Sequence, residues 1–188
     1  MMYLSKGLVK EQSTGNSLSL ARGGREYLLT GLEAALWLRG RSSFENTRLQ
    51  IEEKAVYQLH QKGLVEMETD SGALQKYRIL TRCVCCPVKR VGRMSVRLGG
   101  KEQKIDTWIR KAGICLSVAE LAYLMEHEVP IAPEYFHSRN RQHLIMSIYC
   151  ENNIQDNLLE QQMEQARCRD EVVSGILELV RKKRIIIL

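Results

Sequence analysis

Residues 29–35 read LTGLEAA, and residues 116–122 read LSVAELA. The two segments align without a gap at an offset of 87 residues, and each carries Thr or Ser three residues before a glutamate. In that spacing the hydroxyl accepts a hydrogen bond from the third backbone N–H of a helix, and the glutamate accepts one from the N–H of the capping residue. Both segments therefore predict the start of a capped helix, at Thr30 and at Ser117.

A second pair of segments matches further along the chain. Residues 55–59 (AVYQL) align with residues 175–179 (GILEL) at an offset of 120, and Lys62 aligns with Lys182. Each match then runs into a short apolar segment. Two matches in the same order favour a duplicated unit, whose second copy carries 33 more residues, the difference between the two offsets.

We therefore predict an α+β fold built from two related helix-helix-strand units that share an antiparallel sheet. The first copy covers residues 1–112 and the second covers residues 113–188, with the insertion at about residues 128–169. A polar helix is expected within that insertion, at residues 155–165.

The first copy has clear local signals. Residues 17–20 and 25–29 flank Ala21-Arg22-Gly23-Gly24 and predict a hairpin. A helix from Thr30 should end near Gly40, and a second helix over residues 44–62 should be capped by Gly63. Residues 73–86 are read as a third helix or as a strand, and the spacing of their apolar residues favours the helix. From residue 88 to 116 we expect a strand meander, with strands at 93–98 and 103–110 and with one apolar and one basic face.

The charge of the chain is concentrated in one stretch. The net charge is +6, but residues 76–111 contain eleven basic and two acidic residues, a net +9, which leaves −3 for the rest. Such a positive field attracts anionic partners. No apolar run reaches the roughly 20 residues of a membrane helix, and the first residues do not read as a secretory signal. We expect a cytoplasmic protein with no membrane partner.

The cysteines do not define a metal site or a catalytic site. Cys83 and Cys86 form a C-x-x-C pair, but the second pair that a zinc site needs is missing. The six thiols are expected to stay reduced in the cytoplasm. The sequence shows neither a nucleophile beside a base nor a phosphate-binding glycine loop. We therefore predict a protein that is not an enzyme and uses no cofactor.

One binding hypothesis is nucleic acid. The capped helix, the longer helix ending near Lys62 and a hairpin around residues 70–72 resemble a winged helix, a fold of DNA-binding proteins and transcriptional regulators. In this alternative Lys76 and Arg78 would lie on the wing. The predicted contacts are Arg48, Gln50, Lys54, Gln58, Gln61, Lys76 and Arg78.

The other hypothesis is a protein-binding adaptor or chaperone. The order of elements over about residues 27–98, with Leu36-Trp37, Lys62-Gly63-Leu64-Val65, Gly72 and Pro87, resembles the EspG family of type VII secretion-associated chaperones. The resemblance implies a bacterial, duplicated α+β protein that holds a secreted helical substrate.

We favour the adaptor, which would bind an acidic or helical protein on a basic sheet face; formation of a homo-oligomer stays open. The predicted partner-binding residues are Arg90, Arg93, Met94, Val96, Arg97, Lys104 and Ile105.

Overall fold

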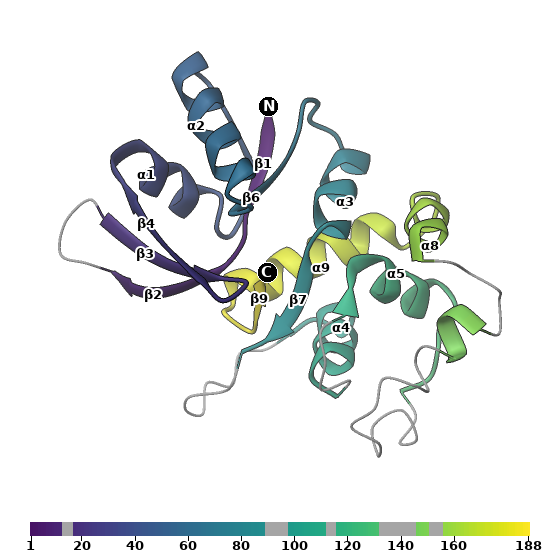
Figure 1. Ribbon diagram of the computed structural model, residues 1–188. Coiled ribbons are helices and arrows are strands. Elements are labelled where there is room, and N and C mark those ends of the chain that lie inside the picture. Colours follow the sequence, from purple (N-terminus) through teal and green to yellow (C-terminus); the bar gives the residue numbers. More distant parts are fainter. Residues whose placement is uncertain (13–16, 89–97, 112–115, 132–145, 151–155) are drawn as a thin grey trace. The chain divides into compact units, whose positions relative to one another are not determined.

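The structure is a computed structural model that describes residues 1–12, 17–88, 98–111, 116–131, 146–150 and 156–188. Its helices and small antiparallel sheets confirm the α+β class (Figure 1). The contacts divide the chain into two compact units. The first unit contains Met1–Cys83 and Ile186–Leu188, and the second contains Val84–Ile185. Within the described residues, no helix is both long and apolar enough to cross a bilayer.

The first unit contains two three-stranded sheets. In one of them β1 is central, with β5 on one side and β6 on the other. The other is an antiparallel meander of β2, β3 and β4, and its second turn confirms the predicted hairpin. Gly23 and Gly24 form that turn with φ angles of 55° and 77°, which glycine adopts without steric cost. The strand bounds are β1 Met2–Ser5, β2 Leu8–Gln12, β3 Ser17–Arg22, β4 Arg25–Thr30, β5 Glu45–Asn46 and β6 Val65–Glu68.

Three helices complete the first unit: α1 Gly31–Arg39, α2 Gln50–Gln61 and α3 Ala73–Thr81. The end of α1 at Gly40 is confirmed. The third helix predicted over residues 73–86 is confirmed over Ala73–Thr81, but its expected end is wrong, because Val84–Pro87 forms a strand. The capping box predicted at Thr30 is wrong, because the Thr30 side chain makes no cap hydrogen bond. Gly31 follows it with a φ of 52°, so the backbone enters the helix through a left-handed residue. The carboxylate of Glu33 instead pairs with Lys62.

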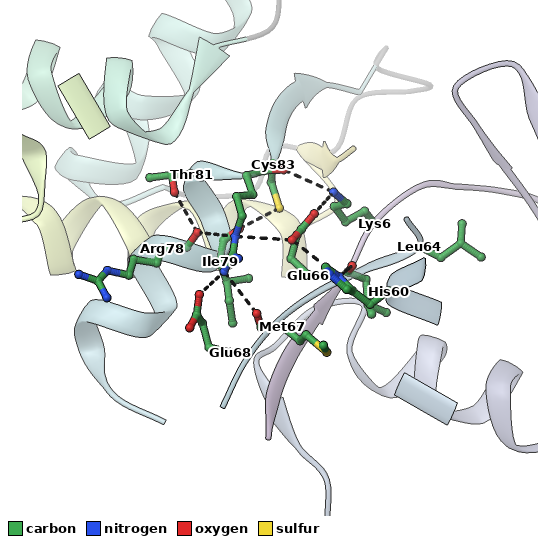
Figure 2. A network of polar contacts seen from close by, with 12 residues as sticks. Lys6, His60, Leu64, Glu66, Met67, Glu68, Arg78, Ile79, Thr81 and Cys83 are labelled. Carbon is green, nitrogen blue, oxygen red and sulfur yellow. Dashed lines mark hydrogen bonds and ion pairs between the residues drawn. The ribbon is translucent and has the colours of Figure 1, made fainter. Parts of the chain in front are cut away.

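The first unit also contains a buried network of charged side chains, which Figure 2 shows. The ammonium group of Lys6 is 2% exposed and pairs with the carboxylate of Glu66. Arg82 Nε lies 3.5 Å from Glu66 Oε2, and His60 Nδ1 lies 3.1 Å from the carbonyl of Val65. A buried charge must be paired in this way because its desolvation is costly. The network joins β1, β6 and the end of α3 into one framework.

The second unit places helices around the antiparallel pair of β7 and β8. The strand predicted at residues 103–110 is wrong, since α4 forms a helix there. Ile105, Trp108 and Ile109 are buried at helical spacing and account for the difference. Strand residues 93–97 of the predicted meander lie outside the described residues. The elements are β7 Val84–Pro87, α4 Gly100–Lys111, β8 Leu116–Ser117, α5 Val118–Glu126, a π-helix at Met146–Cys150, α8 Asp156–Met163, α9 Arg169–Arg181 and β9 Ile185–Ile187.

The helix predicted inside the insertion is present as α8, and the capping box at Ser117 is confirmed. Ser117 Oγ accepts a hydrogen bond of 3.1 Å from the Glu120 N–H, and the Ser117 N–H donates one of 2.8 Å to Glu120 Oε2. The two predicted copies thus differ at their first cap.

The exits of α2 and α9 have the same backbone hydrogen bonds. The N–H of Leu64 donates to the Leu59 carbonyl, and the N–H of Arg184 donates to the Leu179 carbonyl, both at 2.8 Å. One residue earlier, Gly63 and Lys183 have φ angles of 70° and 52°. Each exit is a Schellman motif, in which a left-handed residue ends the helix. All these positions correspond at the offset of 120 residues.

Candidate functional site

The inner side of α1 is fixed to the framework of the first unit. Trp37 is fully buried, and its indole Nε1–H lies 3.1 Å from both the Lys6 and the Leu64 carbonyls. The hydroxyl of Tyr3 donates a 3.0 Å hydrogen bond to the carbonyl of Leu36. These bonds satisfy buried polar groups, so they fix the position of the helix as well as its packing.

Ion pairs join α1 to α2 near both ends. Arg39 Nη1 donates to Glu52 Oε1 at 2.9 Å, and Lys62 Nζ lies 2.6 Å from Glu33 Oε1. The hydrogen bond from Arg39 lowers the pKa of Glu52 to about 2, and the backbone N–H of Arg48 contributes to the shift. Helices α1 and α2 pack against each other, and α1 also contacts β4 (Figure 1). The two ion pairs fix α1 and α2 to each other.

One exposed side of α1 carries apolar residues. Leu32 and Leu38 are 39% and 44% exposed, and Ala35 lies exposed between them on the same side of α1. Leu28 of β4 precedes them and is 68% exposed. We call Leu32, Ala35 and Leu38 the α1 outer face. A group of exposed apolar side chains on a well-fixed helix is typical of an interaction surface.

The corresponding face of α5 in the second unit is covered. At the offset of 87, Leu32 corresponds to Ala119 and Ala35 corresponds to Ala122, which are 1% and 0% exposed. In addition to α9, helix α5 contacts α8 and the π-helix. Both of these lie in the insertion that the first unit lacks. The chain itself therefore supplies the cover in the second unit.

Polar contacts hold this cover on α5. The thiol of Cys168 donates a 3.3 Å hydrogen bond to the carbonyl of Ala122, and the Cys168 N–H donates one of 3.0 Å to Glu126. The hydroxyl of Tyr149 donates to Glu120 Oε1 at 3.1 Å. Burial raises the pKa of the Cys168 thiol to about 12, with a further contribution from Glu126, so this thiol stays protonated. Cys168 therefore serves as a buried hydrogen-bond donor to α5.

The predicted partner-binding residues do not form a sheet face in the part of the chain that the structure describes. Lys104 is exposed on α4, whereas Ile105 is fully buried and cannot reach a partner without unfolding. The other five predicted residues, Arg90, Arg93, Met94, Val96 and Arg97, lie outside the described residues.

The predicted nucleic-acid contacts divide between two helices. Arg48 precedes α2, and four glutamine and lysine residues line a shallow groove of about 510 Å³ together with Met1, Glu53 and Tyr57. Lys76 and Arg78 lie on α3, so the predicted wing at this position is wrong. The four residues on the groove are Gln50, Lys54, Gln58 and Gln61.

The described residues give little indication of a reactive thiol or of a metal site. Burial raises the pKa of Cys83 to about 12, and its Sγ lies 3.3 Å from the carbonyl of Ile79. Across these residues, no three His, Cys, Asp or Glu side chains are grouped as metal ligands would be. Cys86 lies buried in β7. The absence of a cofactor stays a prediction.

No protein-family model, curated protein or solved structure matches this chain. The resemblances to the EspG family and to a winged helix therefore stay predictions.

Sequence reasoning missed the α1 outer face, although a signal for it was present. The segment GLEAALWLR of α1 has Ala34, Leu36 and Trp37 on its buried side and apolar residues on its exposed side as well. A helix that is apolar all round is usually covered on both sides. The first unit leaves one of those sides open.

Proposed function

We propose that the chain is a cytoplasmic, non-catalytic adaptor that binds a helical segment of another protein on the α1 outer face. A single observation carries the proposal: α5 contacts helical segments of the insertion and has Ala119 and Ala122 buried and Met125 partly buried, whereas the corresponding Leu32, Ala35 and Leu38 of α1 are exposed. A partner helix would occupy on α1 the place that α8 occupies on α5. Recognition of an apolar helix face by a second helix is a common mode of protein binding.

The chemistry of the surface agrees with a protein partner. At the N-terminal end of α2, close in sequence to Arg39 of α1, Leu49 and Ile51 are also exposed. Two of the nearby charges, Arg39 and Glu52, are already paired with each other. The cores of protein interfaces are depleted of free charges and enriched in apolar and aromatic groups.

Nucleic acid is the second candidate, because Gln50, Lys54, Gln58 and Gln61 gather on one side of α2. Glutamine can read adenine in the major groove. Affinity for DNA, however, depends on phosphate contacts from lysine and arginine. The groove has Lys54 as its one lysine and places Glu53 beside it. The arrangement of the charges therefore favours the adaptor.

The experiment is a selection of helical peptides on the purified full-length chain. Amphipathic peptides of about 12–16 residues are displayed and enriched, and the winners are titrated against the wild type, Leu32→Asp and Leu38→Asp. Lys76→Asp is the matched control, because Lys76 is exposed on α3, away from the α1 outer face. We expect each leucine variant to weaken binding at least tenfold, which corresponds to about 1.4 kcal/mol, and the control to bind as the wild type does.

Peptides that bind Leu32→Asp and Leu38→Asp as tightly as the wild type would remove the α1 outer face from the proposal. A gel shift with random duplex DNA, run at low and moderate salt, tests the alternative. Binding that falls steeply with salt and is lost in Lys54→Glu would favour the nucleic-acid function instead.

A further inference from the structure

Arg41 follows α1 directly and is held against Trp37. Its guanidinium carbon lies 5.2 Å from the centre of the Trp37 ring, a distance at which the cation and the ring attract each other. The backbone N–H of Arg41 donates to the Leu38 carbonyl at 3.3 Å. Arg41 therefore lies just beyond the C-terminal end of α1, three residues after Leu38, with its guanidinium on the Trp37 ring.

The charge of Arg41 has no carboxylate partner among the described residues. Its Nη1 is buried, and no described group accepts a hydrogen bond from it. Three carboxylates close in sequence are engaged elsewhere: Glu45 accepts from Ser43 at 2.7 Å, Glu33 pairs with Lys62 at 2.6 Å, and Glu52 accepts from Arg39 at 2.9 Å. Burial lowers the pKa of Arg41, and desolvation is the cause.

A guanidinium that is partly desolvated and unpaired costs free energy, and an anion would offset that cost. Stacking on Trp37 fixes the planar group, so less side-chain entropy is lost when a ligand binds. Nη1 is buried, but the Arg41 residue as a whole is only partly buried, so we expect an anion to reach the guanidinium through its other N–H groups. A carboxylate matches the two parallel N–H groups of a guanidinium.

We infer that Arg41 is an anion-binding residue that receives a carboxylate, and that this carboxylate belongs to the partner segment on the α1 outer face. The source of the carboxylate rests on the proposed adaptor function. Binding of the anion itself does not. The partner would then be an amphipathic helix with an Asp or Glu side chain near the C-terminal end of α1.

The test uses Trp37 as its reporter. The chain has two tryptophans, so Trp108→Phe leaves Trp37 as the only one. Sodium acetate is titrated at constant ionic strength against chloride, and inorganic phosphate is titrated in a parallel arm. We expect a saturable change in Trp37 emission with acetate, with half-saturation in the millimolar range, and a rise in melting temperature over the same range.

Arg41→Gln should raise the half-saturation concentration at least tenfold, whereas Arg48→Gln, an exposed arginine seven residues away, should leave it unchanged. An equal acetate response in Arg41→Gln, or no saturable response in either readout, would overturn the inference. Saturation by phosphate without saturation by acetate would overturn the assignment to a carboxylate.

The role in partner binding is tested separately, with the selected helical peptides. Replacing their Asp and Glu residues by Asn and Gln should weaken binding to the wild type at least fivefold and leave binding to Arg41→Gln unchanged. Equal losses in both proteins would contradict the second half of the inference. Failure of the peptide selection would contradict the adaptor and leave the acetate result standing.

Discussion

Helices α1 and α5 open with matching segments of sequence, yet one is half exposed and the other is enclosed. On α5 the covered positions hold small residues, Ala119 and Ala122, which allow the neighbouring helices to approach closely. At the first of the corresponding positions α1 has Leu32, which offers more apolar area to a binding partner. The insertion is thus both the largest difference between the two predicted copies and the source of the cover.

The exits of α2 and α9 differ in side chains rather than in backbone. Leu64 is fully buried after α2, whereas Arg184 occupies the corresponding position after α9 and is 9% exposed. Arg184 is neutralised by Asp106, with Nε 3.2 Å from Oδ1, and Arg110 Nε donates to the same Asp106 oxygen at 2.8 Å. The same turn is therefore compatible with an apolar residue or with a buried ion pair.

The largest expected effect compares Ala122 with Ala35. Ala122→Asp would bury an unpaired carboxylate beneath the cover of α5, and we expect a loss of more than about 4 kcal/mol, enough to unfold the second unit. Ala35→Asp places the same charge in solvent and should change stability by less than about 0.5 kcal/mol. Urea unfolding followed through Trp108 for the first variant and through Trp37 for the second measures both. Equal losses would show that the two faces do not differ in cover.

The next effect concerns the buried charge after α9. Asp106→Ala leaves Arg184 without its carboxylate and should cost about 3–5 kcal/mol. Replacing both members, with Asp106→Leu and Arg184→Leu, installs an apolar exit like that of α2 and should recover most of the loss. Chemical denaturation followed by Trp108 emission checks this. A double variant as unstable as Asp106→Ala would mean that the second exit depends on the ion pair itself.

A pH effect is expected at the junction of α1 and α2 in the first unit. Because the folded pKa of Glu52 is lowered to about 2, its ion pair with Arg39 stabilises the fold above pH 4.5 and is lost as the pH falls toward 2. We expect a contribution of about 2 kcal/mol, reduced from the full shift because Arg39 is a third exposed. Trp37 melts between pH 2 and 6 should show this slope in the wild type, and a flatter one in Glu52→Gln. Parallel slopes in the two proteins would contradict the assignment.

The smallest effect compares the two helix caps. Ser117→Ala removes the hydrogen bond that Ser117 Oγ accepts from the Glu120 N–H and should cost about 1 kcal/mol. Thr30→Ala removes no cap hydrogen bond and should cost no more than about 0.3 kcal/mol. Denaturation midpoints read through Trp108 and Trp37 separate the two. A loss at Thr30 as large as that at Ser117 would mean that Thr30 caps α1 in solution.

Turns, helix ends and helices that depend on residues close together in the sequence could be predicted from local signals. The Gly23-Gly24 hairpin, the stop at Gly40 and the left-handed residue at Gly63 each follow from the conformations that glycine allows. The third helix follows from the spacing of apolar residues. These features require little knowledge of the rest of the fold.

Features set by distant contacts could not be predicted in the same way. Glu33 looks like a capping residue, but its carboxylate is taken by Lys62, 29 residues away. Gly99 and Gly100 predict a turn between strands at 93–98 and 103–110, but Ile105, Trp108 and Ile109 follow a helical period instead. The exposure of Leu32 and Leu38 depends on a covering segment that only the second unit has. No local pattern records that difference.

The central claim is that a partner helix binds the exposed α1 outer face in the cell. Site-specific photo-crosslinking tests this directly, with a benzophenone amino acid placed at Leu32, Ala35 or Leu38, or at Lys76 on α3 as the control. We predict crosslinks from all three α1 positions to one helical segment of one partner, mapped by mass spectrometry, and a loss of at least tenfold from position 35 when Leu38→Asp is added. Crosslinks to the same residues of a second copy of this chain would make the partner a homo-oligomer. The account is contradicted if the three α1 positions give no more specific product than the Lys76 control.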